Sequence, residues 1–548
     1  MWSGAATSKS FAIMIRGYGG SDLVVSDSTG HSVFEFNIPV SNTYDVMRVD
    51  VTDLRPNTMY EYRVGEDVGR VKTFSSGVQS TLRVGLSSCG ASGSTSDVYS
   101  EIANQNIDLF IHQGDIHYED IAVNDTDVFL DAFDIVHSSS SQRKLYQSAP
   151  IVYMYDDHDF GPNNADKMSP SLDAAISNYR RSVAHYELER HGDGAVYHAF
   201  NIGRIRFVVP DLKSEMLNEG RIMSSKQLEW FLSEIRNAKR YAAVVLALGV
   251  PWVSETEGWS QYPEDRTIVS NTILEVFRNS TGASLGGHAN IIGIAGDAHM
   301  LAFDDGTNSR SGIPIIQAAP LERIGSNKGG TYTSGCFGFS ASFTSQYAIL
   351  DISDSGVGGS ESVCMHVELR RAGVSSPLYE TSFCGPFINN TKRSDFSKVC
   401  YLPMFTPSQQ TELVFGTIFF FLVLALWLGR SISTWTFFKQ KIAPFLCRNC
   451  SVGEDTGRCC DFKGQFAAYN VGIGSLWLAL EMIILGTGIL SKSYKPYRAS
   501  DPANLFRLML ITFVPLCVLL CISISVKKED ASGTKNIKLP PTGPKLQS

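Results

Sequence analysis

Residue types that commonly bind metal ions gather at the ends of four apolar, strand-like segments, LRVGLSSC, DLFIHQGDIHY, IVYMYDDHDF and NIIGIAGDAHM. The residues concerned are Cys89, Asp115, Tyr118, Asp156, Asp157, His158, Asp297 and His299. In an open α/β sheet the carboxyl ends of the strands share one rim, and ligands bind there. The spacing therefore predicts that these side chains meet in one cluster, and it favours a metal-dependent hydrolase.

The types of these side chains suit two neighbouring cations. Asp115 follows a glycine at a strand end, so its carboxylate could bridge two ions. Asp297 and His299 alternate along one strand end and would point to the same side. A strongly Lewis-acidic cation would ionise Tyr118 and Cys89, whose side chains ordinarily have pKa values of about 10 and about 8.5. Taken alone, Cys89 is better explained as a small buried thiol.

Positions 156–159 hold four ionisable residues in succession, a density that a protein core does not accept without compensation. Bound cations would relieve the repulsion between the carboxylates. His158 could then be a neutral neighbour of the ligands, or it could protonate a leaving-group oxygen. The following segment, GPNNAD, offers Asn163 and Asn164 as hydrogen-bond donors to an anionic oxygen.

Strands and helices alternate from residue 82 onward, which predicts a mostly parallel sheet covered by helices. Helices are expected at 95–104, 128–136 and 225–239. Three later strands are expected in IRFVVPDLKS, AAVVLALGVPWV and IIGIAGDAHM. The segments that follow, to about residue 387, are expected to be antiparallel strands that complete a second sheet.

Residues 1–78 show the short alternating segments of a small antiparallel β-sandwich. The stretch VDVTDLRPNTMYEYRV resembles fibronectin type III modules, in which a Leu-x-Pro-x-Thr-x-Tyr run buries its tyrosine, here Tyr60. We expect such a module to pack against or space its neighbours rather than to carry chemistry.

Four motifs in order carry a family resemblance: SSC at 87–89, GDIHYED at 114–120, YDDHDFGPNNAD at 155–166 and GDAHM at 296–300. Behind a fibronectin-like module, they resemble the PhoD-type alkaline phosphatases and phosphodiesterases of the calcineurin-like metallophosphatase superfamily. The resemblance implies a four-layer α/β/β/α catalytic domain over residues 80–390. The expected fold class is α/β, with this sandwich preceded by the small β-sandwich and followed by transmembrane helices.

By position, the resemblance implies a ferric iron site beside a site for calcium or another divalent cation, with Asp115 as the bridge. The implied iron ligands are Cys89, Asp115, Tyr118 and His299, and those of the second ion are Asp115, Asp157 and Asp297. His158 would lie at the leaving group, and Asn164 or Asn163 at the phosphate.

One segment departs from the family pattern. Where many relatives have Asp-Thr-Arg-Ser, this chain has Asp211, Leu212, Lys213 and Ser214. An ammonium there replaces a guanidinium that could bind two phosphate oxygens at once. Lys213, Arg180 and Arg181 are therefore all candidates for a substrate-binding cation.

The expected reaction is hydrolysis of phosphate mono- or diesters by in-line attack of a metal-activated water, without a phospho-enzyme. No group of residues in the sequence supports a serine nucleophile. Two alternatives remain open: a catalytically silent membrane receptor or adhesion protein on the same fold, and a lipid phosphodiesterase. The net charge of −8 and the pI near 5.8 give no reason to expect nucleic-acid binding.

Three apolar runs predict membrane helices at residues 413–428, 471–490 and 506–526. The segments around them would be a juxtamembrane linker, a cysteine-containing loop and a polar tail, at 391–412, 430–469 and 527–548. Lysines and arginines after the first span and at the C-terminal end favour the cytosol for both, which would place the N-terminal part in a lumen or outside the cell. Asn-x-Ser/Thr triplets at Asn124, Asn279 and Asn389 agree with glycosylation on that side.

The chain starts without a secretory signal peptide. We expect a truncated start; otherwise the first span exports the domain, or the domain stays cytosolic. In an oxidising compartment, one or two disulfides could form among Cys336, Cys364, Cys384 and Cys400. In the predicted cytosolic loop, zinc binding, acylation and free thiols are all open for Cys447, Cys450, Cys459 and Cys460.

Overall fold

The computed structural model describes residues 1–40, 45–77, 79–192, 194–217, 220–254, 257–278, 290–326, 332–337, 344–356, 362–385 and 387. Within these ranges, no helix is long and apolar enough to cross a bilayer. The predicted membrane helices, linker, cysteine-containing loop and tail lie outside the described residues, as do Asn279, Asn389 and Cys400. Those predictions stay untested.

A nine-stranded sheet has the order β20-β19-β18-β8-β9-β10-β1-β2-β5. Its strands are β1 (Trp2–Gly4), β2 (Phe11–Ile15), β5 (Met47–Val51), β8 (Ser80–Ser87), β9 (Leu109–His112), β10 (Ile151–Tyr153), β18 (Gln346–Asp354), β19 (Val363–Arg371) and β20 (Tyr379–Cys384). The central strands β8, β9, β10 and β1 are parallel. Their carboxyl ends therefore meet at one edge, as the sequence predicted for β8, β9 and β10.

A seven-stranded sheet has the order β11-β12-β13-β14-β16-β15-β17. Its strands are β11 (His198–Ile202), β12 (Ile205–Val209), β13 (Ala243–Gly249), β14 (Ile291–Ala295), β15 (Leu301–Asp304), β16 (Ile315–Ala318) and β17 (Ser334–Phe337). The strands β12, β13, β14 and β16 are parallel. All seven residues of β13, AVVLALG, are buried, which is the pattern of a central strand covered on both faces.

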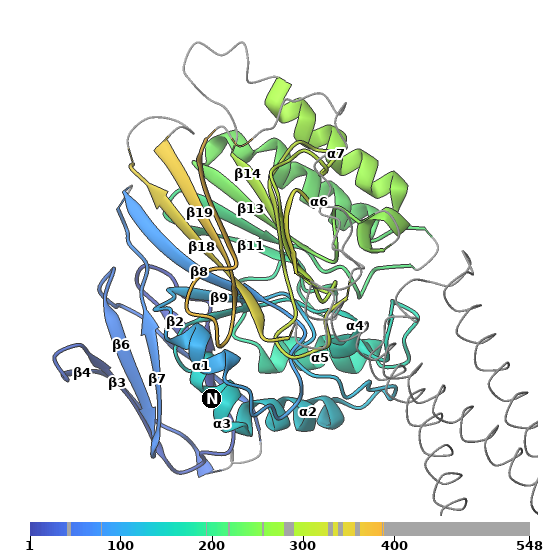
Figure 1. Cartoon of the computed structure of the whole chain (residues 1–548). Coiled ribbons are helices and arrows are strands. Elements are labelled where there is room, and N and C mark those ends of the chain that lie inside the picture. Colours follow the sequence, from blue (N-terminus) through green and yellow to red (C-terminus); the bar gives the residue numbers. More distant parts are fainter. Residues whose placement is uncertain are drawn as a thin grey trace, which may run out of the picture. The chain divides into compact units, whose positions relative to one another are not determined.

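The two large sheets pack face to face, and helices cover their outer faces (Figure 1). On the nine-stranded sheet lie α1 (Val98–Ala103), α2 (Thr126–Ser138), α3 (Ser140–Tyr146) and α5 (Leu172–Ser182). On the seven-stranded sheet lie α6 (Ser225–Arg236) and α7 (Pro263–Arg278), with 3₁₀ turns η2 (Ala238–Arg240) and η3 (Gly258–Gln261) nearby. The described part of the chain is thus a mixed α/β protein, as expected.

Helix α6 shows why these segments become surface helices. Ser224 caps its start by accepting a hydrogen bond from the backbone N–H of Gln227 at 3.2 Å. Leu228, Phe231, Leu232 and Ile235 recur at helical spacing and are buried against the seven-stranded sheet. Each such side chain contributes roughly 1.5–3 kcal/mol through burial. The observed α-helix ends three residues before the predicted one, and the 3₁₀ turn η2 follows it at Ala238–Arg240.

Residues 1–78 form two facing layers, but only one of them is a separate sheet. That four-stranded antiparallel sheet, β4-β3-β6-β7, consists of β3 (Asp22–Asp27), β4 (Ser32–Asn37), β6 (Met59–Val64) and β7 (Asp67–Lys72). The other layer, β1-β2-β5, continues into the nine-stranded sheet where Gly4 pairs with Ile151. A side chain at Gly4 would come within 2.6 Å of the Ile151 carbonyl oxygen, so glycine permits this junction. A break between the predicted domains at residue 78 is therefore not visible in the sheets.

The tyrosine of the fibronectin-like motif is buried, as that motif indicates. Tyr60 is 2% exposed, and its hydroxyl oxygen accepts a hydrogen bond from the backbone N–H of Arg55 at 2.9 Å. Its ring lies 6.3 Å from that of Phe11 in the facing layer. The contact joins the two layers across their common core.

The late antiparallel strands correct one prediction. β18, β19 and β20 do not complete the second sheet, because β18 pairs along its length with β8 in the nine-stranded sheet. Leu350 of β18 faces the core between the sheets, whereas Ile349 faces the helix layer. A strand buried on both faces has no alternation that could reveal its sheet.

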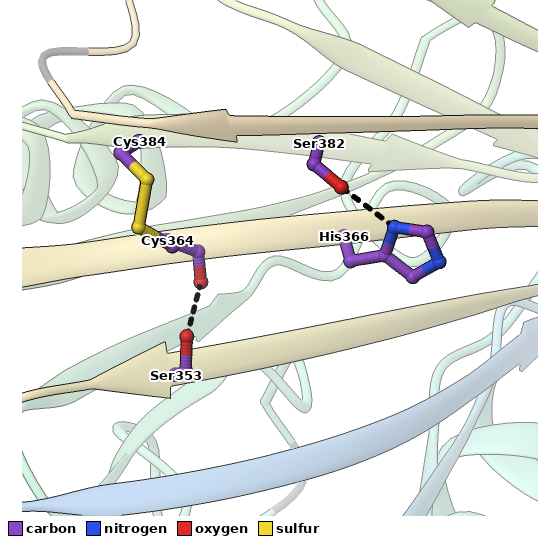
Figure 2. Close-up of a disulfide and its surroundings, with 5 residues drawn as sticks. All are labelled: Ser353, Cys364, His366, Ser382 and Cys384. Atoms are coloured by element: carbon purple, nitrogen blue, oxygen red, sulfur yellow. Dashed lines mark hydrogen bonds between the residues drawn. A yellow bond between two sulfur atoms is a disulfide. The ribbon is translucent and has the colours of Figure 1, made fainter.

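One of the expected disulfides is present. Cys364 of β19 and Cys384 of β20 are directly paired in register and joined by a disulfide, as Figure 2 shows. On the same pair of strands, His366 Nδ1 hydrogen-bonds to Ser382 Oγ at 2.8 Å. The disulfide fastens the outermost strand, β20, to β19. Disulfides of this kind are typical of oxidising compartments.

Candidate metal centre

Four loops meet at the edge where the parallel strands end. Cys89 follows β8, Asp115 follows β9, Asp156 follows β10 and Asp297 follows β14. The first two loops are joined by backbone hydrogen bonds, from Cys89 N–H to the Gly114 carbonyl at 3.1 Å and from Gly90 N–H to the Asp115 carbonyl at 2.9 Å. These two hydrogen bonds hold the loops that carry Cys89 and Asp115 together without a bound ligand.

The backbone at this edge is unusual, because several non-glycine residues have positive φ. They are Cys89 (62°), Asp115 (56°), Asn164 (62°), Asp297 (60°) and His299 (48°). Such conformations are costly for residues with a Cβ and tend to cluster at functional sites. Gly114 (φ 94°) also has no room for a side chain, since an added Cβ would lie 2.4 Å from that of Asp156. The loops after β9 and β10 therefore approach each other closely at Gly114 and Asp156, and the surrounding structure holds the residues with positive φ in their strained conformations.

Three overlapping groups of side chains could each hold a metal ion, with one ligand atom per residue within 4.8 Å of the others. The first cluster is Cys89, Asp115 and His299; the second is Asp115, Asp157 and His158; the third is Asp156, Asp157 and Asp297. Asp115 and Asp157 each belong to two clusters. The eight ligand-type residues of the sequence thus all lie at one centre once Tyr118 is added.

Tyr118 joins the first cluster through its hydroxyl group. The hydroxyl donates to Asp115 Oδ2 at 2.7 Å and lies 3.2 Å from His299 Nε2. His299 Nδ1 donates to the Ile324 carbonyl oxygen at 3.0 Å, which leaves the Nε2 lone pair facing the cluster. The four residues that the resemblance implies as iron ligands are therefore in mutual reach.

Burial makes the ionised forms of these groups costly without a cation. Burial first, and then the Asp115 carboxylate, raises the pKa of the Cys89 thiol well above its usual value. Burial, followed by Asp115 and Cys89, does the same to the pKa of Tyr118. Burial and the neighbouring aspartates raise the pKa of Asp115 well above its usual value. A bound cation would reverse these shifts by stabilising the anionic forms.

Lys213 supplies a cation from within the protein. Its ammonium Nζ lies 2.6 Å from Asp156 Oδ1, and both side chains are buried. Burial raises the pKa of Asp156 to about 8, although Lys213 pulls it down. Asp211 organises the same loop, because its carboxylate accepts from the backbone N–H groups of Val196, Lys213 and Ser214. The predicted substrate-binding lysine is thus in an ion pair with a ligand-type aspartate.

His158 and Asp159 differ in role although they are neighbours on the short helix α4 (Asp157–Phe160). His158 Nδ1 lies 2.5 Å from Asp120 Oδ1, and its ring lies 4.1 Å from the Tyr118 ring. The Asp159 carboxylate accepts from the backbone N–H groups of Asp115 at 2.5 Å and Ile116 at 2.6 Å. Asp159 therefore clamps the Asp115 loop.

The remaining predicted residues lie around this centre. Asn163 and Asn164 are exposed, and the backbone N–H of Asn164 donates to Asp157 Oδ2 at 2.6 Å. Arg180 donates to the carbonyl oxygens of Arg190 and Gly194, and Arg181 pairs with Asp45. Asn124 is exposed ahead of α2. The substrate-binding and glycosylation roles stay predictions.

Sequence reasoning missed two residues at the centre. Asp120 stands five positions after Asp115 in the motif GDIHYED, and that carboxylate was the available signal. Arg323 lies with its guanidinium carbon Cζ 3.9 Å from the centre of the Tyr118 ring. Nothing in its neighbourhood in the sequence, PLERIGS, marks it as part of the site.

Comparison with known proteins gives a distant structural likeness only. No protein-family profile and no curated protein matches the sequence. A solved structure entitled "Structure of PhoD" is similar with a TM-score of 0.52 and 15% identity, over 70% of this chain and 88% of that one. A purple acid phosphatase from yellow lupin (Lupinus luteus) seeds has a TM-score of 0.45 and 11% identity, over 70% of this chain and 73% of that one. The first match shows that the core has a metallophosphatase-like fold.

Proposed function

We propose that this protein is a metal-dependent phosphoesterase that hydrolyses phosphate monoesters, diesters or both. One observation carries the proposal: Asp115 and Asp157 are each shared between neighbouring clusters of ligand-type side chains. Shared carboxylates hold two cations close together, which is the arrangement that phosphate-ester hydrolysis exploits. The metallophosphatase-like fold supports it. The catalytic domain would be the four-layer sandwich of residues 80–390.

The donor sets suit two different cations. A thiolate, a phenolate, an imidazole and a carboxylate from Cys89, Tyr118, His299 and Asp115 would suit ferric iron. Oxygen ligands alone, from Asp115, Asp157 and Asp297, would suit calcium or another divalent cation. Among the described residues, Asp157 and Asp297 share a cluster whose third member is Asp156 rather than Asp115. With cations bound, the buried thiol and carboxylates would be ionised without uncompensated charge.

When bound, the cations would lower the pKa of a water molecule and neutralise charge on the phosphoryl group. The side chains of the protein perform the other tasks. Asp120 holds Nδ1 of His158, which leaves Nε2 to give a proton to the leaving-group oxygen. Asn164, or its neighbour Asn163, is exposed and would donate a hydrogen bond to a phosphate oxygen. Asp159 keeps the Asp115 loop in position throughout.

We further propose that the enzyme is tethered by its three C-terminal apolar runs, with the catalytic domain in a lumen or outside the cell. The disulfide between Cys364 and Cys384 supports an oxidising compartment. Exposure of Asn124 is compatible with glycosylation at its triplet. Mapping of glycans at Asn124, Asn279 and Asn389 in cells tests this proposal. The absence of glycan at all three sites, together with a cytosolic location of the catalytic domain, would refute it.

The activity is tested with the full chain in detergent, loaded with iron and calcium. p-Nitrophenyl phosphate or its bis ester should be hydrolysed, and Asp115→Asn should abolish turnover. Asp131→Asn, on the exposed face of α2, makes the same charge change away from the site and should keep activity. Turnover of neither ester, or full activity in Asp115→Asn, would refute the proposal and leave the silent receptor as the better account.

A visible absorption band from tyrosinate bound to ferric iron tests the iron site separately. The band should appear in the oxidised, iron-loaded protein and vanish in Tyr118→Phe. Its absence from the iron-loaded wild-type protein would remove Tyr118 from the ligand set while leaving the phosphoesterase proposal intact.

A further inference from the structure

Arg323 places an exposed guanidinium beside Tyr118 of the candidate metal centre, and no described residue forms an ion pair with it. Its guanidinium lies over the Tyr118 ring, and the residue is exposed. Among the described residues, no carboxylate pairs with it and no hydrogen bond engages its side chain. A guanidinium stacked on an aromatic ring keeps the N–H donors in its own plane free for an anion.

The backbone on both sides of Arg323 is tied to the first cluster. Glu322 N–H donates to the Cys89 carbonyl at 3.1 Å, and the Ile324 carbonyl accepts from His299 Nδ1 at 3.0 Å. The Ser326 N–H donates to the His299 carbonyl at 2.9 Å. The position of Arg323 is therefore fixed relative to two ligand-type residues, as a substrate-binding group requires.

Tyr118 is a common neighbour of Arg323 and of the proposed proton donor His158. The Arg323 Cζ lies 3.9 Å from the centre of the Tyr118 ring, and the His158 ring centre lies 4.1 Å from it. The guanidinium and the imidazole therefore both border the same side chain of the candidate metal centre.

The other three cationic side chains that the sequence offered for substrate binding have partners within the protein. Lys213 is 6% exposed and paired with Asp156, and Arg181 is paired with Asp45. Arg180 donates to backbone carbonyls of the 190–195 segment. Of these four side chains, Arg323 is the one that has neither a carboxylate nor a carbonyl partner among the described residues.

We propose that Arg323 binds the non-bridging oxygens of the substrate phosphate and biases the enzyme toward monoesters. The inference rests on the proposed function. A monoester near neutral pH carries close to two negative charges and exposes three terminal oxygens, whereas a diester carries one charge and exposes two. A guanidinium gains more from the former, because both charge and paired hydrogen bonds contribute.

The test uses the full chain loaded with iron and calcium, with Arg323→Met and Arg323→Lys. Arg236→Met, at an exposed ion pair on α6, is the matched control. Arg323→Met should lower kcat/KM for p-nitrophenyl phosphate about 10- to 100-fold, the scale of one hydrogen bond to a charged group. The loss for the bis ester should be several-fold smaller, and Arg323→Lys should recover part of it.

Binding of inorganic phosphate, measured by calorimetry on the metal-loaded protein, gives a readout without turnover. Arg323→Met should weaken it by a factor similar to the loss in kcat/KM, while Arg236→Met should not. If the wild-type protein hydrolyses neither ester, the proposed function fails, and unchanged phosphate affinity in Arg323→Met would separately overturn this inference.

Two further outcomes would overturn it in an active enzyme. Equal losses for the two esters would refute the bias toward monoesters. A shift of the tyrosinate absorption band in Arg323→Met with unchanged phosphate affinity would mean that Arg323 acts on Tyr118 alone, which would refute substrate binding.

Discussion

Strand β9 and the loop after it send buried ionisable side chains into two regions of opposite character. The acidic rim consists of Cys89, Asp115, Tyr118, Asp156, Asp157 and Asp297 at the ends of the strands. The histidine pocket consists of His112, His117 and His137 with the rings of Phe133 and Tyr146, under the helix layer. His112, Asp115 and His117 alternate between the two within six residues.

The acidic rim holds groups that would be anionic with cations bound. Burial raises the pKa of Asp156 to about 8 in the absence of bound cations. The folded state then binds a proton that the unfolded state releases near pH 4, so stability falls as pH rises from about 4 toward 8. Cations that bind the carboxylates would oppose this loss. A positively charged ligand would therefore stabilise the ionised rim.

The histidine pocket holds groups that stay neutral. Neither ring nitrogen of His112, His117 or His137 has a hydrogen-bond partner in the described residues, and burial lowers the pKa of each imidazole to about 3. Aromatic rings surround them, with Trp2 4.7 Å from His137. Burial of titratable groups is therefore not itself a sign of function; the informative difference is whether the charged form has a way to be compensated.

The largest expected effects on activity come from replacing one residue at each of the two candidate metal sites in the acidic rim. Cys89→Ser and Asp157→Asn should each lower kcat/KM roughly a thousandfold or more, because each removes several kcal/mol of metal-dependent stabilisation. Metal analysis should separate them: Cys89→Ser loses iron, whereas Asp157→Asn keeps iron and loses the second cation. Iron loss in Asp157→Asn with iron retained in Cys89→Ser would reverse the assignment of the two sites.

Lys213→Met tests the internal cation of the rim. Removing one partner of a buried ion pair typically costs about 3–5 kcal/mol, since the other charge is left uncompensated. We expect that loss of unfolding free energy at pH 9, where Asp156 is mostly ionised, in urea titrations of the metal-free protein. Adding Asp156→Asn should restore much of it. A stable single variant would show that Lys213 does not compensate Asp156.

The sequence was sufficient for the ligand-type residues that follow strands. The apolar runs before Cys89, Asp115, Asp156 and Asp297 fix where each strand ends, and parallel strands bring those ends together. The structure accordingly gathers them at one edge.

What the sequence could not give depends on contacts between distant segments. Arg323 reaches Tyr118 across about two hundred positions of sequence through a loop that bonds to Cys89 and His299. Asp159 and Asp157 have the same side-chain chemistry, and only the fold directs one to backbone N–H groups and the other to the clusters. The sheet that receives β18 is equally a matter of tertiary packing.

Asp120→Asn tests whether a carboxylate beside the rim acts through His158. An amide would orient the imidazole less well, so kcat/KM should fall roughly 10- to 100-fold, the usual scale for such a supporting carboxylate. The loss should be larger for an alkyl phosphate than for p-nitrophenyl phosphate, because only the poorer leaving group needs a proton. Equal losses for both substrates would indicate a structural role, and Asp131→Asn serves as the control.

His137→Phe tests the pocket, where the smallest effect is expected. The folded state excludes a proton that the unfolded state binds below about pH 6.5, so the stability from neutral His137 is present above that pH and is lost as pH falls toward 3. Between pH 7.5 and 5 the wild-type protein should lose about 2 kcal/mol more unfolding free energy than His137→Phe. Urea titrations at the two pH values measure this, with His31→Phe on an exposed turn as the control. If His137→Phe loses as much unfolding free energy between pH 7.5 and 5 as the wild-type protein, protonation of this imidazole in the folded state is compensated by a partner. The contrast between the histidine pocket and the acidic rim would then be wrong.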